Sequence, residues 1–84
     1  MEVLEGGMIR AHTFVKVQPQ KTRDVARQLV GIAGVKAAHP CWGMPDVIAQ
    51  MEVRDQAVLE NLVFGQIQAI KGVIETDTPI VLRD

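Results

Sequence analysis

Segments in which apolar and polar residues alternate are separated along this chain by segments with a helical repeat. Because successive side chains of a strand point to opposite faces, alternation predicts strands. The alternating segments are residues 9–17, 35–42, 47–53 and 73–82. Apolar residues spaced three and four apart predict one helix from Thr22 to Gly34 and another from Asp55 to Gly72. Thr22 and Asp55 are the candidate N-caps of these helices. The predicted order is therefore β-α-β-β-α-β.

Two β-α-β units of similar length predict an α+β, ferredoxin-like fold, βαββαβ. Its four-stranded antiparallel sheet has the spatial order 4-1-3-2, with both helices on one face. Proline has no N–H to donate to a sheet and is tolerated on edge strands. Pro40 and Pro79 lie in the second and fourth predicted strands, which are the edges of this order. We expect residues 1–8 to form a flexible N-terminal arm, with Met8 as an alternative start, and residues 9–84 to form a single domain.

The sheet face away from the helices is predicted to mix apolar and polar side chains. Phe14 and Ile48 are too apolar to be left in water, while their neighbours are too polar for a dry core. This mixture is typical of a contact with a second subunit. A chain of 84 residues also gains from a partner, because a short chain buries a smaller share of its surface. The predicted interface residues are His12, Phe14, Ile48, Gln50 and Phe64, the last of which is either a further contact or simply exposed.

Composition and charge exclude several classes of function. Nine basic and ten acidic residues are interspersed, so the basic patch of a nucleic-acid-binding protein is missing. The apolar runs are too short to span a bilayer. The sequence contains no phosphate-binding glycine loop, CxxC pair or HExxH zinc motif. A single cysteine allows no internal disulfide and, with no visible signal peptide, predicts a cytoplasmic protein.

Candidates for catalysis or metal binding are few. His39 and Cys41 share a strand face, but two ligands are too few for a metal site. Cys41 has no base at a defined spacing that would activate it as a nucleophile. A place in the sheet interface is sufficient to explain His12. The sequence therefore predicts neither an enzyme nor a bound metal or cofactor.

The order of several short motifs resembles the effector-binding domain of the Lrp/AsnC regulators, also called the RAM domain and similar to ACT domains. The strand AHTFVKVQP, the turn WGMPDV and the closing GVIETDTPIVL carry the resemblance, from about Arg10 to Leu82. Its most specific parts are the G-x-x-D turn, Gly43–Asp46, and the T-x-T segment, Thr76–Thr78. Where this chain has Pro45, the family often has an aromatic residue. Full-length members carry a DNA-binding helix-turn-helix that this chain lacks, so it resembles the stand-alone version and no direct DNA binding is expected.

The resemblance implies that a small amino acid binds at subunit interfaces and changes the assembly of a dimer or higher ring. Asp46 would pair with the ammonium, and backbone N–H groups of the turn would receive the carboxylate. Trp42 and Met44 would line an apolar pocket. The expected effector-binding residues are Trp42, Gly43, Met44, Pro45, Asp46, Thr76 and Thr78. A full-length Lrp/AsnC regulator would be a further partner.

Other interpretations of the same residues remain open. The turn needs no ligand to explain it, because Gly43 permits a positive φ, Pro45 presets a turn dihedral and Asp46 accepts backbone hydrogen bonds. Thr76 and Thr78 also suit a strand for their β-propensity alone. The protein could be an assembly module without a ligand. It could also be a small ferredoxin-like enzyme of the monooxygenase or haem-handling type, although its helix-facing residues include no charged group.

Overall fold

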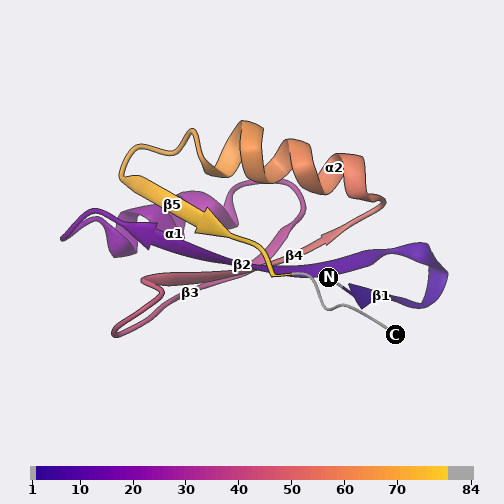
Figure 1. Ribbon diagram of the computed structural model, residues 1–84, viewed down its shortest axis with the longest axis horizontal. Coiled ribbons are helices and arrows are strands. Elements are labelled where there is room, and N and C mark those ends of the chain that lie inside the picture. The colour runs from indigo at the N-terminus through magenta and orange to yellow at the C-terminus, as the bar shows by residue number, and fades with distance from the viewer. Residues whose placement is uncertain (1, 80–84) are drawn as a thin grey trace.

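The long strand β2, Ile9–Val17, runs through the middle of an antiparallel sheet (Figure 1). In the computed structural model of the protein, residues 2–79 are described. Strand β4, Val47–Val53, pairs with β2 on one side, and β3, Val35–Pro40, forms the edge beyond β4. Strand β5, Val73–Asp77, pairs with β2 on the other side. The predicted ferredoxin-like order is thus confirmed, with β3 and β5 at the edges. Pro40 is the last residue of β3, but β5 ends at Asp77, so Pro79 follows the strand rather than lying within it as expected.

Two helical segments pack against one face of this sheet (Figure 1). Helix α1 spans Thr22–Val30, and α2, Gln56–Glu60, continues as the π-helical segment η2, Asn61–Ile67. The apolar side chains that alternate along β2 and β4 form the core with the buried faces of these helices. The largest fully buried side chains are Leu29, Met51, Leu62, Ile67, Val15, Val25, Val47 and Thr13. Within residues 2–79, no helix has the length and hydropathy needed to cross a membrane.

The helix ends differ in part from the expectation. Asp55 caps α2 as expected, because its Oδ1 accepts a hydrogen bond from the Val58 N–H at 2.9 Å. Thr22 is the first residue of α1 rather than its cap, since Lys21 holds the N-cap position without a side-chain hydrogen bond. Helix α1 stops at Val30 and η2 stops at Ile67, both earlier than expected. Residues 31–34 form a turn in which Gly34 has a φ of 97°. Ile32 nevertheless packs against the core from this turn. An apolar period thus located the buried residues correctly but did not define where the hydrogen-bonded helix ends.

The segment expected to be a flexible arm carries secondary structure. Strand β1, Glu2–Val3, pairs with the start of β2, and a short 3-10 turn, η1, spans Glu5–Gly7. Strand β1 therefore shares one side of β2 with β5, and an additional short strand joins the four expected ones. Arg10 lies between Glu2 and Glu52, at 3.5 and 3.3 Å. These ion pairs connect β1 to β2 and β4.

The face opposite the helices is called here the open face. It carries His12, Phe14 and Lys16 from β2 and Ile48, Gln50 and Glu52 from β4. Strand pairing places His12 opposite Gln50 and Phe14 opposite Ile48. All six side chains are half-buried or exposed, in contrast to the buried residues that alternate with them. The open face therefore has the mixed character predicted from the sequence.

Candidate functional site

The loop of residues 41–46, between β3 and β4, is fixed to the end of β2 by backbone hydrogen bonds. The Asp46 N–H donates to the Val15 carbonyl at 3.1 Å, and the Cys41 N–H donates to the Asp46 carbonyl at 2.7 Å. The Asp46 carboxylate oxygen Oδ2 accepts from the Val17 N–H at 2.8 Å. At the tip of the loop, Gly43 has a φ of 100°, which favours glycine. The turn interpretation of these residues is therefore supported by their contacts.

The Asp46 carboxylate has a structural role within the chain, in addition to the contact with a ligand ammonium that we expected. Its carboxylate satisfies an N–H of β2 just beyond the last β2–β4 residue pair, Val15 and Val47. Beside this bond the β2–β5 ladder changes register between Lys16 and Val17. The carboxylate thus holds the loop in place beside β2.

We expect Asp46→Ala to destabilise the domain by about 1–3 kcal/mol, because the Val17 N–H loses its acceptor. Asp46→Asn keeps an oxygen at that position and should cost less than half as much. Urea denaturation at one fixed protein concentration would measure both changes. Equal losses in the two variants would show that the negative charge, rather than the acceptor oxygen, is what matters.

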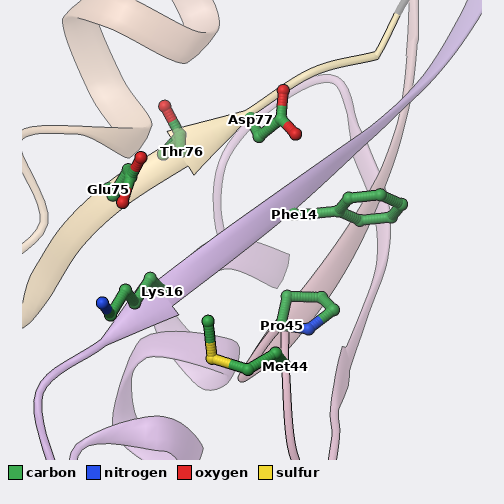
Figure 2. Close-up of a pocket in the computed structure, with 7 residues that line it drawn as sticks. All are labelled: Phe14, Lys16, Met44, Pro45, Glu75, Thr76 and Asp77. Atoms are coloured by element: carbon green, nitrogen blue, oxygen red, sulfur yellow. The ribbon is translucent and has the colours of Figure 1, made fainter.

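A depression of about 360 Å³ lies between β2, β5 and the loop of residues 41–46 (Figure 2). Figure 2 shows side chains reaching it from all three segments. The lining residues are Phe14, Lys16, Met44, Pro45, Glu75, Thr76 and Asp77. Lys16, Met44, Glu75 and Asp77 are exposed, so the depression is open to solvent on the open face. A second protein surface laid over this face would close it.

Charged and apolar groups lie next to one another within the depression. Lys16 lies opposite Glu75 and Phe14 lies opposite Asp77 in the β2–β5 pairing. Directly opposed residues of a strand pair project to the same face, so all four belong to the open face. No ion pair within 4 Å joins Lys16 to Glu75 or Asp77 in the described part of the chain. An ammonium and two carboxylates are thus available beside the apolar surface of Phe14, Met44 and Pro45.

The structure brings together only some of the residues expected to bind an effector. Met44, Pro45 and Thr76 line the depression. The Thr76 hydroxyl is directed away from the loop in Figure 2 and accepts a hydrogen bond from Gln68 Nε2 at 2.8 Å. The Thr78 hydroxyl shares a 2.7 Å hydrogen bond with the buried Thr13. These two threonines therefore tie β5 and the residues after it to the rest of the fold.

Trp42 and Gly43 lie away from this depression. Trp42 is fully exposed and lines a separate hollow of about 270 Å³ with Thr22, Arg23, Pro40 and Cys41. A Cβ added to Gly43 would have nothing within 4 Å. A ligand role for Trp42, Gly43 or Asp46 stays a prediction. The lining residues Lys16, Glu75 and Asp77 were missed as binding residues, although alternation in β2 and β5 places them on one face.

The residues expected at a subunit interface occupy two sides of the domain. His12, Phe14, Ile48 and Gln50 lie together on the open face. Phe64 is 67% exposed on η2, on the helical side of the sheet. One two-fold contact through the open face cannot include Phe64, so a role for it requires a second contact surface, as a ring does. The interface itself stays a prediction.

No group of three or more histidine, cysteine or acidic side chains within residues 2–79 is arranged to hold a metal ion. Cys41 is half-buried and its Sγ donates to the His39 carbonyl at 3.4 Å. His39 and Cys41 therefore make this hydrogen bond with one another. Among residues 2–79, no third side chain joins them to form a metal site.

The family model for the Lrp/AsnC ligand-binding domain matches residues 10–84, almost the whole chain. The chain belongs to this family. The sequence-based resemblance is confirmed, and the domain is a ligand-binding domain of a family of transcription regulators. The description of the family and the names of the relatives refer to regulators rather than to enzymes.

Curated relatives of this Lrp/AsnC domain are longer proteins. An uncharacterised helix-turn-helix transcriptional regulator of Pyrococcus furiosus is 30% identical over 76 residues, which are 90% of this chain and 51% of that protein. The chain thus spans about half the length of the curated relatives it matches.

Solved structures share the fold. A hypothetical protein of Pyrococcus horikoshii has a TM-score of 0.79 at 23% identity, over 89% of this chain and 90% of that one. A transcriptional regulator of Neisseria meningitidis, in complex with L-methionine, has a TM-score of 0.74 at 18% identity, over 89% of this chain and 50% of that one. At these identities the likeness shows the fold alone.

Proposed function

We propose that this Lrp/AsnC domain binds a small amino acid in the depression between β2, β5 and the loop of residues 41–46. The observation that carries the proposal is the pair of opposite charges there, Lys16 and Glu75, which face one another without forming an ion pair. A free amino acid carries a carboxylate and an ammonium on the same carbon atom. The ligand carboxylate would pair with Lys16 and the ligand ammonium with Glu75, as charge-assisted hydrogen bonds favour.

The size and lining of the depression support a ligand of this kind. Its volume of about 360 Å³ lies at the lower end of the range for small-molecule sites, about 300–1,000 Å³. Met44, Pro45 and Phe14 provide apolar surface for a ligand side chain. The Neisseria regulator, which shares the fold, was solved with an amino acid bound.

We further propose that a second copy of the chain closes the depression through the open face. A site whose charged residues are exposed binds weakly, because water screens each ion pair. A second subunit over Phe14 and Ile48 would bury apolar surface and exclude water from the ligand. The amino acid would then favour the assembled state, because it binds that state better than the monomer. A full-length regulator of the same family could present the same surface, since the relatives are about twice as long.

Isothermal titration with the twenty amino acids at millimolar concentrations, followed by sedimentation velocity, tests this function. We expect at least one amino acid to bind and to shift the protein towards a larger species. Lys16→Met should weaken that binding at least tenfold, since the ligand carboxylate loses its cation. Lys36→Met, on exposed edge strand β3, is the matched control and should leave binding unchanged.

The possible results separate the parts of the proposal. If none of the twenty amino acids binds, the effector function is rejected, and the remaining interpretation is that the protein is an assembly module without a ligand. If an amino acid binds and Lys16→Met does not weaken that binding, the binding site lies elsewhere on the domain.

A further inference from the structure

The charges that line the depression do not balance. Lys16 is matched by Glu75, which lies opposite it on β5. Asp77 lies opposite Phe14, which offers no charge. Arg10, which lies opposite Glu52 of the open face, is paired with Glu2 and Glu52. Among residues 2–79, no cation lies within ion-pair distance of the Asp77 carboxylate.

The depression therefore has two chemically different ends. Figure 2 shows Glu75 and Lys16 at one end and Asp77 and Phe14 at the other. A zwitterionic head group placed between Lys16 and Glu75 leaves no net charge at that end. The Asp77 carboxylate then remains as one uncompensated negative charge beside an aromatic ring.

We propose that the ligand is an amino acid with a cationic side chain, such as lysine or ornithine, and that Asp77 and Phe14 determine this specificity. The inference rests on the proposed function, because it assigns the second half of the same site. A side-chain ammonium at the Asp77 end would pair with the carboxylate and would also be attracted to the face of the Phe14 ring. A neutral side chain of equal length could make neither contact.

The spacing along the strands fits such a ligand. Lys16 and Phe14, like Glu75 and Asp77, are two residues apart on their strands, which corresponds to about 6.7 Å. The four-carbon stem of lysine covers about this distance when it is extended. Its methylene groups would lie against Met44 and Pro45, which supply the apolar side of the depression.

The unbalanced charge also gives the ligand a reason to act on assembly. A second subunit that covers the open face would remove water from Asp77, and an unpaired carboxylate is costly in such a place. A cationic ligand supplies the missing partner. A neutral amino acid would leave the carboxylate unpaired, so it should promote assembly less.

Titration calorimetry with L-lysine and L-norleucine tests the inference, because norleucine has the same carbon stem without the ammonium. We expect the wild-type protein to bind lysine at least tenfold more tightly, a difference of about 1.4 kcal/mol. Asp77→Asn should reduce the ratio to near one. Asp24→Asn is the matched control, since Asp24 is exposed on α1 and should not affect the ratio.

Phe14→Leu provides a second variant that keeps an apolar side chain and removes the ring. It should lower the preference for lysine several-fold. Equal or tighter binding of norleucine, methionine or glutamate would overturn the specificity and leave the proposed function standing. A lysine preference that survives both Asp77→Asn and Phe14→Leu would overturn the assignment of these residues. Failure of every amino acid to bind would reject the proposed function as well.

Discussion

Phe14→Asp should weaken self-association about 30-fold or more, so that protein assembled at micromolar concentration becomes monomeric. Phe14 lies at the centre of the open face, opposite Ile48 on β4 and Asp77 on β5. A central aromatic residue in an interface commonly contributes 2 kcal/mol or more, which corresponds to about this factor. The new carboxylate would also lie directly opposite Asp77, where like charges repel.

Sedimentation equilibrium over a range of concentrations measures this change. Val30→Asp is the control, because Val30 is 53% exposed on α1 and receives the same charge on the opposite side of the sheet. Circular dichroism would establish that both variants keep the fold. A wild-type protein that is monomeric at every concentration, or a Phe14→Asp variant that still assembles, would reject the open face as the interface.

Gly34→Ala should destabilise the domain by about 2–5 kcal/mol. Gly34 has a φ of 97°, which costs a residue with a Cβ about 1–2 kcal/mol. Its added Cβ would also lie 2.8 Å from Leu62 Cδ1 and 3.2 Å from Val53 Cγ1. Leu62 and Val53 are both buried, so they have little room to move and overpacking adds about 1–3 kcal/mol.

Gly43→Ala separates the two causes. Gly43 has nearly the same φ, 100°, but nothing lies within 4 Å of an added Cβ. We therefore expect Gly43→Ala to lower the free energy of unfolding by about 1–2 kcal/mol, which is the cost of the positive φ alone. Urea denaturation of both variants at one protein concentration provides the comparison, since assembly makes stability depend on concentration. Equal losses would show that Leu62 moves aside without cost.

The alternation along β2 and β4 was sufficient to predict both faces of the sheet. Ala11, Thr13, Val15 and Val17 are buried as the period of two requires, and Phe14 lies on the other side. Pro40 correctly predicted that β3 is an edge strand, because a residue without an N–H cannot serve in the middle of a ladder. Pro79 gave no such information, because it lies after the end of β5. Asp55 was predicted as a helix cap because its contact partner is only three residues away.

The contents of the candidate site depended on contacts between distant segments. The Thr78 hydroxyl shares a hydrogen bond with the buried Thr13, 65 residues earlier, and its expected place beside a ligand stays a prediction. The Asp46 carboxylate accepts a hydrogen bond from Val17, 29 residues earlier, and its expected contact with an ammonium stays a prediction. Neither pairing has a local signal, because both depend on how strands fold against one another.

The sequence by itself determined the order of strands and helices, the two sides of the sheet and the family, because these follow from periodicity and from short motifs within single segments. Only the tertiary structure decided that Lys16 meets Glu75 and that Phe14 meets Asp77. The register between β2 and β5 sets these neighbours, and a shift by one residue would turn the side chains of one strand to the opposite face. The chemistry of the depression is therefore a property of the strand pairing.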